Sequence, residues 1–479
     1  MHRIKLFLES YFHLSKHNTS CRQELLAAVT DYFTLLYILS LVPEVIVGSF
    51  PNAINANGEI ILSAQVLNGI TAGQLLASLS IASFWAAGIG SILIGLATNM
   101  PFIQGPSLAI ATFAVYTVCN GFGYTYYQAL AIVFLSGVFF FILSATGIEQ
   151  KIHRAIPQNI KYAVTAGIGM FITYTGLLKA HIINFDGGFP SVFDMLALDT
   201  ADTRSAWLAI IGIILIVILL EKHVHAAIFI GKIVCIALAV PLGLLHITNM
   251  ISFKDIPLGA VLFKPDFHLI SGDTPQSRIF SLTTLLIIIF SICIMDIFET
   301  MSMLIATDHV LKMNDEKARI KGRTLRILEV DALTTSVGSL LGITNVSTYI
   351  ESTTGVIEGA RTGLTAVITG MLFIATSVFA PFAGFVPSAA TATTLIVAGV
   401  LMMNVIKNVD FDQPADAVSA VFTIMLMPLT NSILTGIGFG VIIYLLTRVF
   451  MGKGHRVNPL IYIVALLFAI VLIFLPRNA

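Results

Sequence analysis

The residues Thr344–Leu364 read TNVSTYIESTTGVIEGARTGL, and their polar side chains indicate which class of fold the chain adopts. It holds two glutamates, one arginine and seven Ser or Thr hydroxyls. The chain around it is strongly apolar, because 57% of its 479 residues are hydrophobic and only 11% are charged. A soluble globular protein carries roughly a quarter charged residues. A polar stretch inside so apolar a chain predicts a polytopic α-helical membrane protein that encloses a polar site.

The composition excludes several other classes of protein. The formal net charge is zero, so no nucleic-acid partner is implied. The four cysteines are scattered and form neither a disulfide framework nor a metal-binding spacing. Residues 1–23 are basic and contain no continuous apolar run, so we expect a cytoplasmic N-terminal segment rather than a cleavable signal peptide.

Apolar blocks predict fourteen membrane spans and one further helix. The spans are 24–48, 74–97, 101–117, 126–148, 158–179, 206–220, 226–248, 279–305, 327–342, 348–359, 362–384, 388–406, 416–429 and 431–450, and the further helix is 459–475. The loops 50–72 and 180–204 contain no Lys or Arg except Arg204, whereas 312–326 is rich in Lys and Arg. The positive-inside rule therefore places the N-terminus in the cytoplasm. The basic loop is either a determinant of topology or a site for anionic lipid.

Two short spans occupy matching positions in the two halves of the chain. The sequence TNMPFIQGPS at 98–107 enters the third span, and TNVSTYIEST at 344–353 enters the tenth. Each predicts a few extended residues followed by a half-helix. Interrupted spans at matching positions are typical of inverted-repeat transporters, and seven spans per half would invert the second half.

Asp296 and Glu299 lie within an apolar span, three residues apart and so on one helix face. An acid at membrane depth costs several kcal/mol unless it faces a cavity, a partner or an ion. Desolvation favours the neutral form of a carboxyl, so this pair can take up and release a proton. The alternative is a structural pair inside the helix bundle.

Glu351 precedes Ser352 and Thr353 at the expected start of the half-helix in the tenth span. A carboxylate beside free backbone N–H groups offers acceptors and donors together, which suits a flat heterocycle. The alternative is that Glu351 only caps the helix.

Further candidates lie in the first, third and tenth spans. In the third span, Gln104 and Ser107 can meet a ligand, and Gly105 permits close approach of the backbone. In the first span, Asp31 is either a third proton-binding group or the partner of a lysine. The sequence does not decide whether Glu44 has a functional role, and Arg361 is expected to be structural.

Several stretches resemble one transporter family. GITNVSTYIESTTGVIEGARTGLTAVITGMLF at 342–373 resembles the tenth-span signature of the AzgA-like adenine/guanine/hypoxanthine permeases. MDIFET at 295–300, RQELLAAVTDYFTLLYIL at 22–39 and VPSAATATTLIVAGVLMM at 386–403 are similar to its eighth, first and twelfth spans.

The resemblance implies the fold of the nucleobase/ascorbate transporter superfamily, with fourteen spans in two inverted sevens. A core of 24–148 and 279–384 would hold the substrate. A gate of 158–248 and 388–450 would form most of a homodimer interface, and 459–475 would be an additional C-terminal helix. The core would slide against the gate during proton-coupled uptake of a purine nucleobase across the cell membrane, with no cofactor besides the proton.

The resemblance also assigns residues. The acids of the family's eighth span fall on Asp296 and Glu299, and that of its tenth span on Glu351. The chain differs from the family in its third span, where the family's Asn is Ala111. Three alternatives on the same fold stay open, namely transport of uracil or xanthine, transport of an anion as in the SulP family, and a ligand sensor without transport. No HExxH or GxSxG motif indicates an enzyme.

Overall fold

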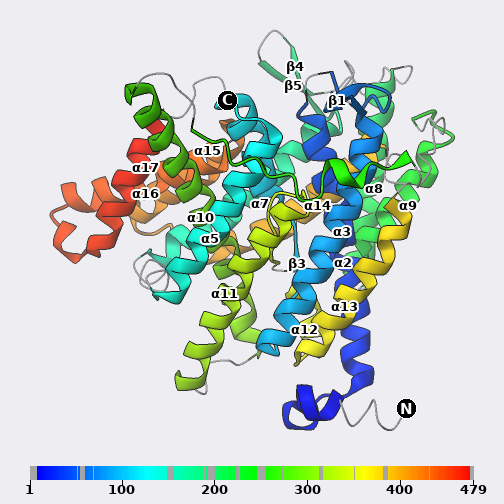
Figure 1. Ribbon diagram of the computed structural model, residues 1–479, viewed down its shortest axis with the longest axis horizontal. Coiled ribbons are helices and arrows are strands. Elements are labelled where there is room, and N and C mark those ends of the chain that lie inside the picture. The colour runs from blue at the N-terminus through cyan, green and yellow to red at the C-terminus, as the bar shows by residue number, and fades with distance from the viewer. Residues whose placement is uncertain are drawn as a thin grey trace.

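The computed structural model describes residues 8–50, 52–53, 60–67, 69–147, 156–186, 189–192, 200–222, 224, 227–244, 255–270, 275–311, 317–349, 351–380, 387–430 and 432–474. Most of these residues lie in long helices that run roughly alongside one another (Figure 1). These helices are α2 (Cys21–Gly48), α3 (Ala72–Thr98), α5 (Tyr126–Ala145), α7 (Gln158–Lys179), α8 (Ala201–Glu221), α9 (Ala227–Ala239), α10 (Pro275–Leu311), α11 (Lys317–Leu340), α13 (Gly363–Thr376), α14 (Ser388–Met403), α15 (Pro414–Leu429), α16 (Ile433–Phe450) and α17 (Pro459–Phe474).

The predicted all-helical membrane fold is confirmed, and the helices follow the predicted spans. Among the described residues, eight helices are long and apolar enough to cross a membrane, and four shorter apolar helices accompany them. The number of fourteen spans stays a prediction. The helix α11 begins at Lys317, well before the predicted start at 327, because the charged residues ahead of the apolar block are also helical.

Local sequence signals explain where several helices begin. Thr71 and Gln74 form a capping box at the start of α3, and Thr125 and Gln128 form another at the start of α5. In each box the threonine hydroxyl accepts from a backbone N–H that the first turn of a helix leaves without a partner.

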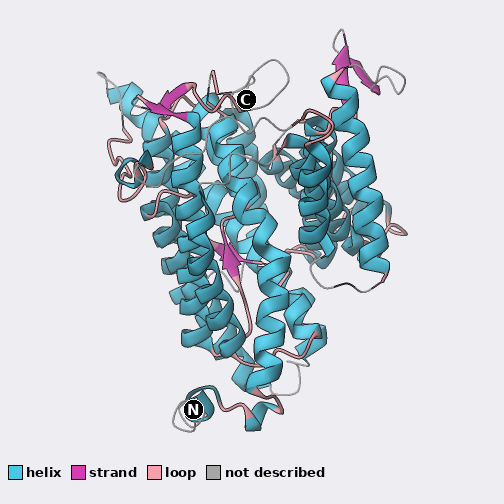
Figure 2. Cartoon of the chain, turned by 90° about the vertical axis from the view of Figure 1, so that its right-hand side faces the viewer, coloured by secondary structure: helices cyan, strands magenta, loops and turns pink. Residues whose placement is uncertain are grey.

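The two short spans are strand and half-helix pairs, as predicted. The strand β3 (Gln104–Gly105) precedes α4 (Leu108–Thr112), which continues as the π-helix η2 (Phe113–Gly121). The strand β6 (Ser347–Thr348) precedes α12 (Ser352–Ile357). The two strands pair antiparallel, with Gln104 opposite Thr348. Figure 2 shows a short strand midway along the helices, so irregular backbone lies at membrane depth, where protein surrounds it.

The helices pack in two groups, each drawing on both halves of the chain. In the first, α13 packs on α3 and α2, and α11 packs on α5 and α3. In the second, α14 packs on α7, α8 and α9, and α15 packs on α7 and α16. The additional helix α17 contacts α16 and α10.

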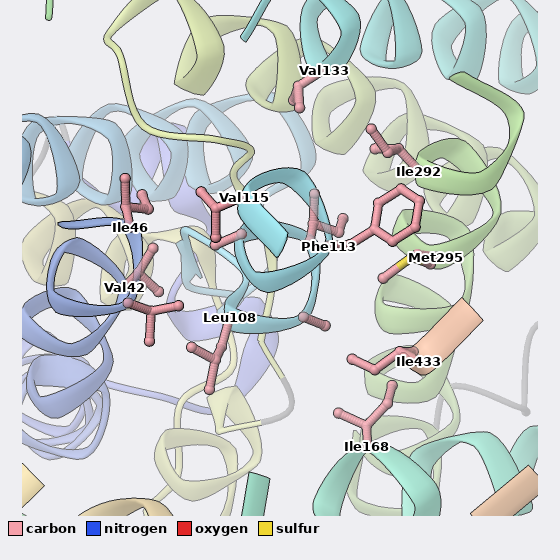
Figure 3. Close-up of a cluster of buried hydrophobic side chains, with 14 of the residues drawn as sticks. Val42, Ile46, Leu108, Phe113, Val115, Val133, Ile168, Ile292, Met295 and Ile433 are labelled. Atoms are coloured by element: carbon pink, nitrogen blue, oxygen red, sulfur yellow. The ribbon is translucent and has the colours of Figure 1, made fainter. Parts of the chain in front are cut away.

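An apolar cluster surrounds the first half-helix (Figure 3). Leu108 and Phe113 lie in the same buried cluster as Val42 of α2 and Met295 of α10. Ile168 of α7 also belongs to it, so the cluster joins both groups of helices. Large apolar side chains thus hold the half-helix in position.

The remaining strands form two hairpins that lie at the end of the molecule opposite the start of α2 (Figures 1 and 2). They are β1 (Gln65–Leu67) with β2 (Ile70–Thr71), and β4 (Ile183–Asp186) with β5 (Phe189–Val192). They come from the two loops that the charge pattern places together, opposite the N-terminal segment. Which end faces outside stays a prediction.

Candidate functional site

A pocket lies beside the paired strands, between the two groups of helices. Its lining residues are Ile38, Leu41, Ser107, Leu108, Ala109, Thr165, Ile168, Ile172, Glu299, Ser347, Thr348, Tyr349, Glu351, Leu395 and Met402. Most of this surface is apolar, and two carboxylates and several hydroxyls converge on it. An apolar pocket with a few convergent polar groups is the usual form of a small-molecule site.

Glu299 is held between the two short strands. The Ser107 hydroxyl donates to its Oε1 at 2.5 Å, and the Ser347 hydroxyl donates to its Oε2 at 2.8 Å. Ser107 also caps α4, because its Oγ accepts from the N–H of Ile110 at 3.2 Å. One residue of each short span thus orients the carboxylate of Glu299.

Glu351 lies at the N-cap position of α12, but its side chain makes no capping hydrogen bond. The side chain lines the pocket instead. Capping therefore does not explain why the chain places an acid here, because a capping side chain accepts from the backbone of the first helical turn.

Asp296 does not line the pocket, although it was predicted to bind substrate. It is completely buried behind the pocket, where the Thr335 hydroxyl donates to its Oδ2 at 2.6 Å. The side-chain amide of Asn345 approaches its Oδ1 at 3.5 Å. The two acids of the predicted pair therefore have different surroundings, since Glu299 lines the pocket and Asp296 is buried behind it.

A third buried acid, Asp331 of α11, lies beside this pair and was not predicted. Its Oδ1 accepts from Gln104 Nε2 at 2.9 Å and from the Thr348 hydroxyl at 2.6 Å, and its Oδ2 accepts from Thr300. The available signal was an acid within the predicted apolar span 327–342, of the kind that singled out Asp296.

The other predicted residues of the short spans support the pocket rather than line it. Gln104 faces Asp331, and the space for its side chain depends on Gly90, where a Cβ would lie 2.7 Å from Gln104 Oε1. A Cβ on Gly105 would approach the Tyr349 ring to 3.2 Å. Ser352 accepts from the Ile103 N–H at 3.0 Å and so ties α12 to the other short span.

Thr353 is half-buried and also lies outside the pocket lining.

Asp31 is completely buried and holds α12 in place. Its Oδ1 accepts from the backbone N–H of Gly355 at 2.7 Å and from the Thr354 hydroxyl at 3.0 Å. The described hydrogen bonds of Asp31 therefore lead to α12 and not to a lysine. One N–H at the start of this half-helix serves Asp31 and is not left for a ligand.

This clamp predicts that Gly355→Ala lowers the stability of the protein by about 2 kcal/mol, because it leaves a buried carboxylate poorly paired. A Cβ at this position would lie 2.2 Å from Asp31 Oδ2. Thermal unfolding in detergent measures the effect. Gly259→Ala is the control, since a Cβ at Gly259 meets nothing within 4 Å. An equal loss in an Asp31→Ala background would show that the clamp is not the cause.

Arg361 has structural contacts, as expected. Its Nη1 donates to the carbonyls of Val356 and Ala360, both at 2.7 Å, and so closes the end of α12. Its backbone N–H donates to Glu24 Oε1 at 2.9 Å.

Glu44 belongs to a buried charge cluster where the two groups of helices meet. It interacts electrostatically with Lys232 of α9 and Lys179 of α7. The Lys232 ammonium donates to the Ser40 hydroxyl of α2 at 2.6 Å. The cluster therefore joins α2 to helices of the other group.

Comparison with known proteins gives the family. The Permease family model matches residues 23–439, which is most of the chain. The chain belongs to the Permease family. A guanine/hypoxanthine permease of Bacillus subtilis, PbuG, is 32% identical over 98% of this chain and 100% of its own length. A putative permease of Methanocaldococcus jannaschii is 32% identical over 98% and 99%. The adenine permease AdeP of Escherichia coli is 28% identical over 98% and 97%.

Solved structures confirm the fold of this permease. The transmembrane domain of the cyanobacterial bicarbonate transporter BicA superposes with a TM-score of 0.59, 14% identity, and coverage of 88% of this chain and 97% of that one. The murine anion transporter Slc26a9 gives a TM-score of 0.55, 12% identity, and coverage of 90% and 69%. The permease is thus a multi-pass membrane transport protein rather than an enzyme, and its relatives include the nucleobase permeases that its sequence resembles.

Proposed function

We propose that this permease takes up a purine nucleobase (hypoxanthine, guanine or adenine) together with a proton. The observation that carries the proposal is the pairing of Glu299 and Glu351 in one largely apolar pocket between the half-helices. Relatives named as guanine/hypoxanthine and adenine permeases support the choice of substrate.

The chemistry of the pocket suits a flat base with polar edges. N–H groups of a purine would donate to Glu351 and Glu299, and the pocket hydroxyls would donate to its acceptors. Apolar side chains such as Ile168 and Leu395 would cover the ring faces. An analogue without the N–H donor would leave a buried carboxylate unpaired, and a site of this kind rejects such analogues strongly.

The coupling ion in this proposal is a proton, and no other cofactor takes part. Asp296, Glu299 and Asp31 are the candidate carriers, because each is a buried carboxyl close to the pocket or to its half-helices. A carboxyl in a low-dielectric site binds a proton more readily than one in water, so protonation can accompany substrate binding.

The proposed movement is that of an elevator. The first group of helices, with both short spans, would form the core, and the second would form the gate and most of a homodimer interface. The pocket supports this division, because Glu299 lies on α10, which packs on α5 of the first group, and Thr165 and Leu395 come from the second. The permease would lie in the cell membrane with its N-terminus in the cytoplasm.

The bicarbonate transporter BicA shares the fold, which makes an anion the second candidate substrate. Two carboxylates in the pocket oppose it, because an anionic ligand would meet like charges at low dielectric.

Thermal shift of the purified permease with a panel of ligands tests the substrate. A ligand that binds only the folded protein stabilises it by about 2.7 kcal/mol at a concentration of 100 times Kd. We expect stabilisation by hypoxanthine, guanine or adenine and none by bicarbonate or sulfate. Stabilisation by uracil or xanthine alone would replace the purine assignment, and stabilisation by an anion alone would overturn the nucleobase proposal.

A further inference from the structure

The helices α10 and α11 carry the same short pattern, an aspartate followed four residues later by a threonine. It is Asp296 and Thr300 in α10, and Asp331 and Thr335 in α11. Residues four apart lie on one face of a helix. Here the two faces meet reciprocally, since Thr335 donates to Asp296 at 2.6 Å and Thr300 donates to Asp331.

Counting the hydrogens available for hydrogen bonding shows that Asp296 and Asp331 differ in their need for a proton of their own. Asp331 accepts from the hydroxyls of Thr300 and Thr348 and from the side-chain amide of Gln104, so its hydrogen bonds need no proton of its own. The Thr335 hydroxyl has one hydrogen but lies between Asp296 Oδ2, at 2.6 Å, and the carbonyl oxygen of Val346, at 3.1 Å. A proton on Asp296 satisfies both contacts, because the hydrogen bond between Asp296 and Thr335 then reverses: the protonated Asp296 donates to Thr335, and Thr335 donates to Val346.

Asp331 also reaches both short strands from behind the pocket. Gln104 belongs to β3 and Thr348 to β6, and these residues are opposite partners in the strand pair. Both side chains converge on the same oxygen of Asp331. A two-residue strand pair has few backbone hydrogen bonds of its own, so hydrogen bonds from both strands to Asp331 fix their position relative to each other.

We propose that Asp331 is a positioning residue of the transport site, a permanent anion that holds β3 and β6 together while a different carboxyl carries the proton. The inference rests on the proposed function and deepens it, because it assigns a role to a residue that does not touch the substrate. It acts through Thr348, which lines the pocket, and through the strands that present Ser107 and Ser347 to Glu299.

Few charged groups surround Asp331. The acids that face it are Asp296 and Glu299 of α10. Of the other helices packed on α11, α3 has no ionisable side chain, and α5 has only Tyr126 and Tyr127. With no described cation beside it, the charge of Asp331 is balanced by hydrogen-bond donors.

Two substitutions distinguish the hydrogen bonds by which Asp331 holds the strands from its negative charge. Asp331→Asn keeps an acceptor for Gln104 and Thr348 and places its amide beside Thr300, whose hydroxyl can accept. Asp331→Ala removes every contact. Glu329→Gln is the matched control, because this half-buried acid lies on the same helix and has no role in the strand pair.

The first measurement is amide hydrogen exchange of the purified permease without ligand. In Asp331→Ala we expect the segments containing β3 and β6 to exchange at least about tenfold faster, because the strands open locally more often. Asp331→Asn should stay close to the wild type, and Glu329→Gln should match it. Unchanged exchange in Asp331→Ala would overturn the proposal whatever the substrate.

The second measurement is uptake of radiolabelled hypoxanthine into proteoliposomes across a range of pH. For Asp331→Asn we expect KM to rise by about 3- to 10-fold with an unchanged pH profile, since the hydrogen bonds from Gln104, Thr348 and Thr300 lose their charge assistance. Loss of concentrative uptake with retained counterflow would make Asp331 the proton carrier and overturn its assignment as a permanent anion. If the wild type transports no nucleobase, the proposed function fails, and hydrogen exchange still decides the anchoring role.

Discussion

Replacing Glu351 by glutamine should abolish nucleobase binding, with an affinity at least about a hundredfold lower, while the fold stays intact. A hydrogen bond to a charged acceptor contributes about 1.5–3 kcal/mol, and the new amide would direct a donor at the donor edge of the base. A loss of about 3 kcal/mol corresponds to a hundredfold in Kd. Titration calorimetry on the purified variant measures it.

The fold should survive this substitution because other residues hold α12. The Glu351 side chain makes no capping bond, whereas Asp31 binds the N–H of Gly355 and Ser352 accepts from Ile103. Glu358→Gln is the matched control, since Glu358 is an exposed acid at the other end of the same half-helix. It should bind nucleobases like the wild type. A Glu351→Gln variant that also binds normally would remove Glu351 from the site.

The architecture around the site could be predicted from local signals in the sequence. The chain reads Pro-Phe-Ile-Gln-Gly-Pro before α4 and carries a run of hydroxyl residues around Glu351, and neither pattern continues a membrane helix. The matching positions of these breaks in the two halves of the chain predict a pair of half-helices. The pairing of β3 with β6 follows from that arrangement.

The distribution of the acids between layers could not be predicted in the same way. Asp296 and Glu299 share a helix face, yet Glu299 reaches the pocket and Asp296 meets Thr335 of α11. That difference depends on how α11 is rotated against α10, which the spacing within either helix leaves open. Asp331 was missed for the same reason, because only the packing brings it between Gln104 and Thr348.

The charge cluster of Glu44 was equally hidden, because its members lie in three helices from distant parts of the sequence. Glu44 is 8% exposed and Lys232 is 5% exposed. The sequence around Lys232, the buried lysine of α9, does not indicate which carboxylate this lysine interacts with. Only the approach of α9 and α7 to α2 shows that two ammonium groups lie near enough to one carboxylate to interact with it electrostatically.

Glu44→Gln should therefore destabilise the permease by about 3–5 kcal/mol, because removing one partner leaves buried charges uncompensated. Lys232 and Lys179 would face each other without their carboxylate. Thermal unfolding in detergent, at a pH where both lysines are charged, measures the loss. Lys232→Met should cost clearly less, since Glu44 keeps Lys179 as a partner and the local charge becomes balanced.

The order of these two variants in stability identifies the cause. If Lys232→Met were the more damaging, the contact of Lys232 with Ser40 would matter more than the excess positive charge.

The cluster also joins α2 to α9 and α7, across the interface along which the proposed core would slide against the gate. A buried charge cluster that has to separate in each transport cycle adds the free energy of its separation to the barrier for transport. Lys232→Met, which removes the direct link to Ser40 at little cost in stability, should thus raise the rate of nucleobase counterflow in proteoliposomes. An unchanged rate would mean that the cluster stabilises the fold and stays intact during transport.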